Sequence, residues 1–156
     1  MPASRRAATP TTDLAGRLAD PGLLQTRGHV GGWREGVGSF AVTDPATGDT
    51  VAEVARMDAG AARDAVDAAE AAFPAWAAAL PQERGNALRR WFQLITAARD
   101  DLARIMVAEQ GKPLSEALGE IDYAASFVEF YAEEAKRPDI DGVTSHLPDA
   151  EVEVWR

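Results

Sequence analysis

Alanine supplies nearly half of the hydrophobic residues in this sequence, and hydrophobic residues make up 46% of its 156 positions. Alanine favours the helical backbone but buries little apolar area. A packed interior therefore depends on scattered leucine, valine, isoleucine and aromatic side chains placed at helical spacing. This composition predicts a helix-rich chain whose hydrophobic core is thin for a free-standing domain.

The spacing of these larger side chains predicts three main helices. The first follows Asp58, a suitable N-cap, and is expected to end at Pro74. The second can begin at Pro81, which the first helical turn tolerates, and is expected to close at Gly111. The third spans about 114–136. The apolar stripes of the three helices comprise Ala62, Val66, Ala69 and Phe73, then Leu88, Trp91, Phe92, Ile95, Leu102, Ile105 and Met106, then Ile121, Ala124, Val128 and Tyr131.

Short strands are expected on both sides of this helical region. Glycines in 28–38 indicate a brief strand and turn, and the segments 40–43 and 50–54 flank a DPATGD turn typical of an antiparallel hairpin. Residues 151–156, EVEVWR, alternate polar and apolar side chains as a half-buried strand does. These elements do not form a closed layered architecture, so we expect part of a larger α/β protein.

Charge and composition exclude several classes of function. The net charge of −9 disfavours partners such as nucleic acid or an anionic membrane, since both require a basic face. No segment is long and apolar enough for a membrane span, and Arg5-Arg6 is not followed by the apolar region of a targeting signal. We expect a cytoplasmic protein whose residues 1–20 form a disordered tail.

Motifs that carry chemistry are scarce. The sequence has no cysteine, and its two histidines, His29 and His146, lie far apart and outside any metal-ligand spacing. Gly111-Lys112 does not fit a phosphate-binding loop, because Met106 and Pro113 occupy positions that require glycine and a hydroxyl residue. No catalytic or cofactor-binding residue emerges from these patterns.

Four aromatic residues in the third predicted helix are the most distinctive side chains. Tyr123, Phe127 and Tyr131 share one edge of this helix, and Phe130 lies beside them. Ordinary core packing is the simpler interpretation of this edge. The alternative is that the rings line an apolar tunnel that holds the carbon chain of a small substrate.

Four segments, taken in order, resemble the opening region of the aldehyde dehydrogenases. They read FAVTDPATGD, AAFPAW, ALRRWFQLI and DDLARIMVAEQGKPLSEALGEIDYAASFVEFYAEEAKR, and the resemblance covers about residues 21–156. Within this superfamily the third helix is most similar to the succinate-semialdehyde dehydrogenase branch. The resemblance implies an α/β fold of which only the N-terminal part is present, with an incomplete Rossmann-like sheet. Residues 151–156 would enter the oligomerisation arm.

The resemblance also implies a reaction. In the family, a cysteine thiolate attacks the aldehyde, hydride passes to NAD or NADP, and a glutamate activates the water that hydrolyses the thioester. The catalytic and cofactor-binding residues of the family follow the part that this sequence matches. We therefore expect the complete enzyme to be a homo-oligomer acting on a small aldehyde substrate. We expect the present chain to be inactive alone, without bound cofactor.

Two site assignments follow from the resemblance alone. Glu109, with the backbone of Val42, matches a position that binds a structural monovalent cation, and Tyr123 and Phe127 match a helix that borders the substrate entrance. A competing hypothesis is a non-catalytic truncated product or helical interaction module. Such a module would pair with another chain through its unfinished strand and exposed apolar faces.

Overall fold

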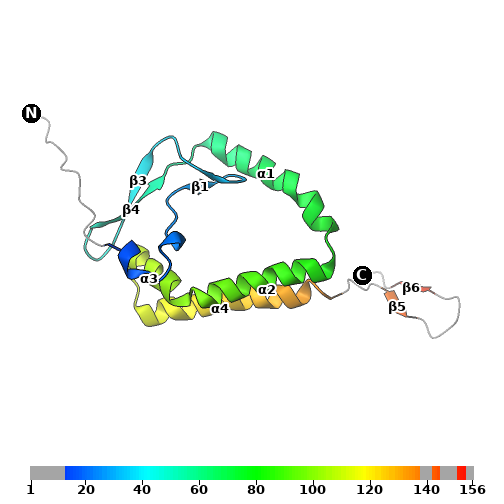
Figure 1. Cartoon of the computed structure of the whole chain (residues 1–156). Helices are drawn as coiled ribbons and strands as arrows, with labels where there is room; N and C mark the ends of the chain where they lie inside the picture. The colour runs from blue at the N-terminus through cyan, green and yellow to red at the C-terminus, as the bar shows by residue number, and fades with distance from the viewer. Residues whose placement is uncertain (1–12, 138–141, 145–150, 154–156) are drawn as a thin grey trace, which may run out of the picture.

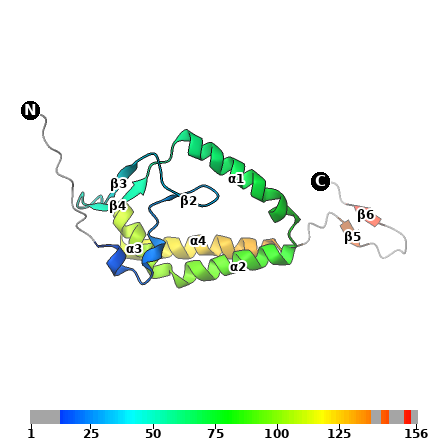
Figure 2. The same ribbon diagram turned by 45° about the horizontal axis from the view of Figure 1, so that its top comes forward.

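The computed structural model describes residues 13–137, 142–144 and 151–153. Within them, α-helices and the two-stranded antiparallel sheets of residues 28–34 and 39–55 enclose an open ring, and the sheet of residues 142–144 and 151–153 lies outside it (Figure 1). The helices form a long bar on one side of the ring and a single arch on the other (Figure 2). The elements in chain order are η1 (Ala15–Arg17), η2 (Pro21–Leu23), β1 (Gly28–His29), β2 (Trp33–Arg34), β3 (Ser39–Thr43), β4 (Thr50–Ala55), α1 (Ala59–Ala78), α2 (Pro81–Ala97), α3 (Arg99–Gln110), α4 (Leu114–Glu134), β5 (Gly142–Thr144) and β6 (Glu151–Glu153).

The bar consists of α2 and α3 packed along α4. Its best-buried side chains are small, since Ala103, Ala117 and Ala132 have no exposed surface. Ile121 adds the larger apolar group of the α3–α4 contact. A Cβ on Gly85 of α2 would lie 2.9 Å from the carbonyl oxygen of Ala132, so these two helices approach closely. The core is thin, as the alanine content predicts.

The predicted second helix is wrong in extent, because two helices, α2 and α3, occupy its range. Ala98 separates them with φ −92° and ψ 9°, outside helical geometry. No proline or glycine marks this break in the sequence. Arg99 forms a two-pronged ion pair with Asp122 of α4, which holds the first turn of α3 against α4. The described chain thus has four α-helices rather than three.

The predicted end of the first helix at Pro74 is also wrong, because α1 continues to Ala78. Its start is confirmed: Asp58 accepts a hydrogen bond from the backbone N–H of Ala61 at 2.8 Å. The predicted apolar stripe has no partner in the described structure, where Val66 and Phe73 are each 65% exposed. The stripe is present in the sequence, but the residues described here do not cover it.

The packed face of α4 differs from the predicted one. The predicted burial of Ile121 is confirmed and Val128 is half-buried, but Ala124 and Tyr131 are exposed. The buried face combines Ile121 with Ala117, Ala125 and Ala132. Close approach of Gly85 on α2 favours small residues at this contact. The aromatic side chains therefore lie outside the bar, and core packing of these rings, the simpler interpretation, is not what the described structure shows.

The strand predictions are largely confirmed. β3 and β4 pair antiparallel through the DPATGD turn, with a shift in register between Val42 and Thr43. Gly48 has φ 77° in this turn, and Gly31 has φ 63° in the turn between β1 and β2; both values favour glycine. β5 pairs antiparallel with β6, so the strand expected at 151–156 is part of a small hairpin over its described residues. Residues 154–156 lie outside the described chain.

The disordered tail predicted for residues 1–20 is wrong for residues 13–20, which belong to the packed structure. Leu14 and Leu18 are buried in a cluster with Val51 of β4. Their burial explains why a segment without helical period is ordered: it fills the space between β4 and α3. Residues 1–12 lie outside the described chain.

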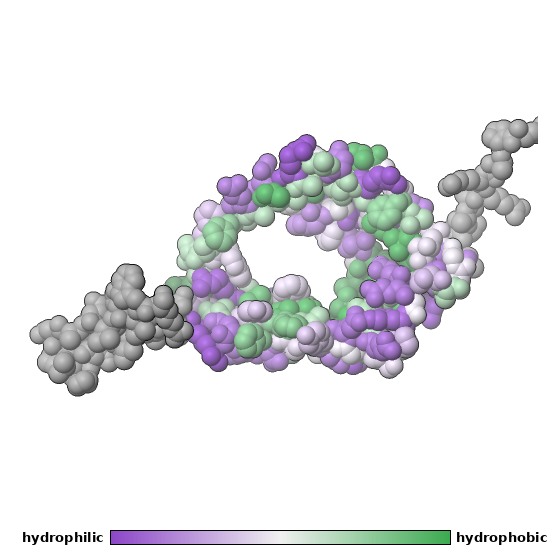
Figure 3. All heavy atoms as spheres, turned by 180° about the vertical axis from the view of Figure 1, so that it is seen from behind, coloured by the Kyte–Doolittle hydropathy of each residue, from purple (hydrophilic) through white to green (hydrophobic). Residues whose placement is uncertain are grey.

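Figure 3 shows an opening that passes through the molecule, with hydrophobic residues on both the arch and the bar around it. None of the side chains of α1 within the described structure is buried. Among the described helices, none combines the length and apolar character required to cross a bilayer.

Candidate functional site

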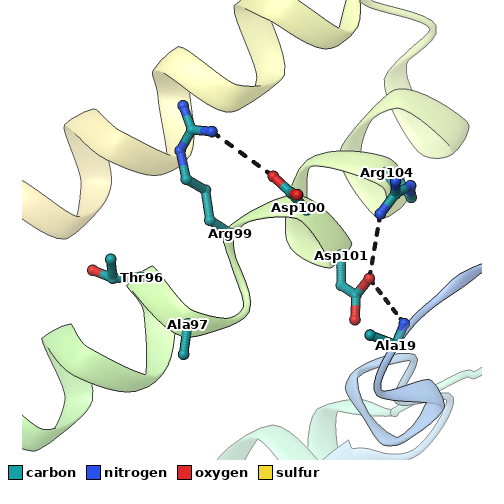
Figure 4. Close-up of a pocket in the computed structure, with 7 residues that line it drawn as sticks. All are labelled: Ala19, Thr96, Ala97, Arg99, Asp100, Asp101 and Arg104. Carbon is teal, nitrogen blue, oxygen red and sulfur yellow. Dashed lines mark hydrogen bonds and ion pairs between the residues drawn. The ribbon is translucent and has the colours of Figure 1, made fainter.

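A small polar pocket of about 330 Å³ lies where α2 ends and α3 begins (Figure 4). Its lining consists of Ala19, Thr96, Ala97, Arg99, Asp100, Asp101 and Arg104. The elements around it come from three parts of the chain: the N-terminal segment, the end of α2 and the first turns of α3. The sequence patterns did not single out this group of charged side chains.

Asp101 is the central carboxylate of this pocket. Its side chain is 6% exposed, and it accepts hydrogen bonds from the backbone N–H of Ala19 at 3.0 Å and of Asp20 at 2.8 Å. The guanidinium nitrogen Nη1 of Arg104 lies 3.6 Å from Oδ1 of the same carboxylate. The hydrogen bonds from Asp20 and Ala19, assisted by Arg104 and opposed by desolvation, lower the pKa of Asp101 below its ordinary value of 3.8.

The other polar groups of the pocket also have partners. Arg99 contacts both carboxylate oxygens of Asp122, at 2.5 and 2.6 Å, and the pKa of Asp122 is lowered mainly by this hydrogen bond. The hydroxyl of Thr96 donates to the carbonyl of Phe92 at 2.9 Å. The ion pair joins α3 to α4, and the Thr96 hydrogen bond lies within α2. Neither contact provides an activated nucleophile or a general base. The pocket is a structural joint.

The lowered pKa of Asp101 predicts a pH dependence of stability. A folded-state pKa below the unfolded value means that the contribution is fully present above the unfolded value and disappears as the pH falls through the folded one. Unfolding free energy measured by urea denaturation should therefore be steady above about pH 5 and fall as the pH drops below the ordinary aspartate value of 3.8. Asp101→Asn should flatten that fall, whereas Asp100→Asn, at an exposed carboxylate, should leave it in place.

Equal acid sensitivity of the two variants would contradict a particular role for Asp101. Asp122 also contributes to the loss of unfolding free energy at acid pH, because its pKa is lowered as well. A residual acid dependence in Asp101→Asn is therefore expected. The comparison between neighbouring aspartates separates the buried carboxylate from general charge effects.

The structure places Tyr123 and Phe127 one turn apart on the outside of α4. Their rings pack edge to face with centroids 4.8 Å apart, and the side chains are 67% and 47% exposed. Phe130 and Tyr131 form a second edge-to-face pair at 5.3 Å. The four residues make one exposed aromatic edge, hereafter the aromatic edge. It offers apolar contact to another segment or molecule but no chemical group for a reaction.

The two residues assigned to a cation site lie on neighbouring elements. Glu109 is exposed in the last turn of α3, and Val42 is half-buried in β3, against which α3 packs. The ladder between β3 and β4 shifts register next to Val42. In the residues that the structure describes, no group of three or more potential metal-ligating side chains occurs. The cation assignment therefore stays a prediction.

The described glycines do not provide a dinucleotide-binding loop. Gly31 lies in the turn between two strands, whereas such a loop joins a strand to a helix N-terminus. Gly111, with φ 70°, ends α3 as predicted, and its N–H donates to the carbonyl of Val107 at 2.8 Å. Gly31 thus serves as a turn residue and Gly111 as a helix cap, so no step of a cofactor reaction is derived from them.

Comparison with known proteins identifies the class to which this arrangement belongs. The model of the aldehyde dehydrogenase family matches residues 33–155. The chain belongs to the aldehyde dehydrogenase family.

Its relatives include semialdehyde dehydrogenases. Glutarate-semialdehyde dehydrogenase of Pseudomonas putida is 46% identical over 136 residues, which are 85% of this chain and 28% of that protein. The NADP⁺-dependent succinate-semialdehyde dehydrogenase of Escherichia coli gives the same identity and coverage. The crystal structure of succinate-semialdehyde dehydrogenase from Burkholderia pseudomallei superposes with a TM-score of 0.76 at 47% identity, covering 85% of this chain and 28% of that one. The chain thus spans about 28% of the length of these relatives.

Proposed function

We propose that this chain forms the N-terminal part of an NAD(P)-dependent aldehyde dehydrogenase that oxidises a small aldehyde carrying a carboxylate, most specifically succinate semialdehyde. The observation that carries the proposal is the 46% identity to the glutarate- and succinate-semialdehyde dehydrogenases over 85% of the chain. Both relatives are named for aldehydes that end in a carboxylate. The complete enzyme would act as a homo-oligomer.

The chain by itself is proposed to be inactive towards aldehydes. The family reaction implied by the resemblance begins with a cysteine thiolate, and this sequence contains no cysteine. Its part in such an enzyme would be structural: the α2–α4 bar would support the aromatic edge beside the path of the substrate. The nucleophile, the general base and the dinucleotide site would come from the part of the enzyme that these residues do not supply.

A chimera provides the test. Residues 13–156 of this chain would replace the matching part of the Escherichia coli enzyme, and NAD(P)H formation would be followed with succinate and glutarate semialdehyde. We expect an active chimera and no activity from the 156-residue chain alone. A chimera that folds and assembles like the parent enzyme but oxidises neither semialdehyde would contradict the proposal.

The same chimera tests the role of the aromatic edge. Replacing Tyr123 and Phe127 together by alanine should raise the KM for the aldehyde by about tenfold, because apolar contacts of this size contribute about 1–3 kcal/mol to substrate binding. The kcat should change little, since the rings lack reacting groups. Trp91→Ala, at an exposed aromatic residue on α2, is the matched control. An unchanged KM in the double variant would remove these residues from the substrate path.

The cation site has an independent test in this chain. If Glu109 contributes a carboxylate ligand, potassium or sodium should raise the melting temperature of the wild type more than that of Glu109→Ala. Glu116→Ala, at another exposed glutamate, controls for the loss of one negative charge. Identical ion responses of wild type and Glu109→Ala would count against the site.

A second candidate function is a helical interaction module. The exposed apolar side chains of α1 and α4 favour it, because contiguous apolar surface marks contact sites. In that case the isolated chain should bind a hydrophobic dye, and the chimera should be inactive although folded. An active chimera favours the dehydrogenase, so one experiment distinguishes the two candidates.

A further inference from the structure

Two turns in the N-terminal segment, residues 13–26, are held by side chains of the segment itself. The carboxylate of Asp13 accepts the backbone N–H of Gly16 at 2.9 Å, and the carboxylate of Asp20 accepts the N–H of Gly22 at 2.9 Å. The two bonds lie at the short helical turns η1 and η2. Because each bond joins residues two or three positions apart, the segment specifies these turns locally.

The segment packs on a surface that β4 and α3 form together. Leu14 is 3% exposed and Leu18 is 7% exposed, and both are buried with Val51 of β4. Ile105 and Ala108 of α3 pack against the same cluster. The two leucines, four positions apart, supply the apolar part of this contact, because packing removes most of their surface from water.

Asp101 supplies the polar part of the same contact. Its carboxylate oxygens accept the backbone N–H groups of Ala19 at 3.0 Å and of Asp20 at 2.8 Å, directly after the second leucine (Figure 4). The Asp101 side chain is 6% exposed. Since the carboxylate meets main-chain groups, it recognises the path of the backbone rather than the side chains that follow Leu18. The residues of β4 and α3 in this contact, hereafter the docking surface, are Val51, Asp101, Ile105 and Ala108.

The contacts of the segment are formed within this chain. At its end, the carbonyl of Thr26 accepts the N–H of Ala55 in β4 at 2.7 Å. Each contact above therefore joins residues 13–26 to β4 or to α3. None of them depends on the length by which the relatives exceed this chain.

We propose that the docking surface is a peptide-binding site whose ligand is the chain's own segment 13–26. The ligand is defined by its chemistry: two leucines four positions apart, followed at once by two backbone N–H groups that meet a carboxylate. In the intact chain, the covalent connection keeps the local concentration of this ligand high, so it outcompetes a free peptide of the same sequence. Binding at this site is independent of the aldehyde reaction.

A fluorescein-labelled peptide of residues 13–27 is the probe, and fluorescence anisotropy measures its binding to the whole 156-residue chain. The receptor is the double variant Leu14→Ser and Leu18→Ser, which weakens the hold of the chain's own segment and leaves the docking surface unaltered. We expect this receptor to bind the peptide. The wild type should bind it at least about tenfold more weakly, because its own segment occupies the surface.

Asp101→Asn, added to that receptor, should weaken peptide binding at least about tenfold, since asparagine offers one uncharged oxygen in place of two charged ones. Asp100→Asn is the matched control, because Asp100 is the exposed neighbour of the same charge, and it should leave binding unchanged. A peptide with Ala19→Ser should bind like the wild-type peptide, since the exposed Ala19 contacts Asp101 through its N–H. A peptide with Leu18→Ser should not bind.

Three results would overturn the proposal. One is the absence of peptide binding by a receptor that keeps the helical circular dichroism of the wild type. Another is equal binding by the wild type and the receptor, or by the receptor with and without Asp101→Asn, which would place the peptide elsewhere on the chain. The third is loss of the helical signal in the receptor, which would make the two leucines part of the core rather than part of a ligand.

Discussion

Gly85→Val should lower the free energy of unfolding of the α2–α4 bar by about 2–3 kcal/mol. A Cβ at this position would lie 2.9 Å from the backbone carbonyl oxygen of Ala132 and 2.8 Å from the side chain of Lys136. The lysine can move aside, but the carbonyl is fixed in α4, so the two helices must separate. Urea denaturation followed by helical circular dichroism measures the change.

Gly119→Val is the matched control, because a Cβ on Gly119 of α4 meets nothing within 4 Å. Valine has a somewhat better helix propensity than glycine, so this variant should differ from the wild type by no more than about 0.5 kcal/mol. If both valine variants were equally stable, close packing at Gly85 would not be what joins α2 to α4.

Ile121→Ala should cost about 2–4 kcal/mol, because it removes the largest buried side chain of the contact between α3 and α4. Its neighbours Ala103 and Ala117 are too small to refill the cavity, and they lie in rigid helices. The same urea titration measures this loss. The unfolding transition should remain a single one in its helical signal if α2, α3 and α4 form one cooperative unit.

Val66→Ala is the control variant, which tests whether a residue of a predicted apolar stripe contributes to stability when the structure leaves it exposed. Val66 belongs to the apolar stripe predicted for the first helix, yet it is 65% exposed on α1. Its replacement should change the unfolding free energy by less than about 0.5 kcal/mol. A loss as large as that of Ile121→Ala would show that α1 packs against another part of the chain in solution.

The local features of this protein follow from short stretches of sequence. Asp58 caps α1, Gly111 ends α3 with φ 70°, and the DPATGD segment turns the chain between β3 and β4. Each of these depends on residues a few positions apart, whose backbone preferences act without the rest of the fold. The membership of the aldehyde dehydrogenase family likewise could be inferred from the order of segments in the sequence, and the family match confirms it.

The candidate site could be predicted only in part. The sequence places Tyr123 and Phe127 on one edge of a helix, but it favours burying them. Their exposure depends on which face of α4 meets α2, and the close approach of Gly85 selects the alanine face. No local signal distinguishes these two faces, because both carry apolar residues at helical spacing.

The sequence by itself determined the helical content, the hairpin turns and the helix caps, because these depend on interactions between near neighbours. Only the tertiary structure decided the break at Ala98, the buried face of α4 and the hydrogen bonds that Asp101 accepts from Ala19 and Asp20. The reason is physical. Each of these three features depends on a partner from another part of the chain, and a hydrogen bond or a contact across some 80 residues forms only when the fold brings the two segments together.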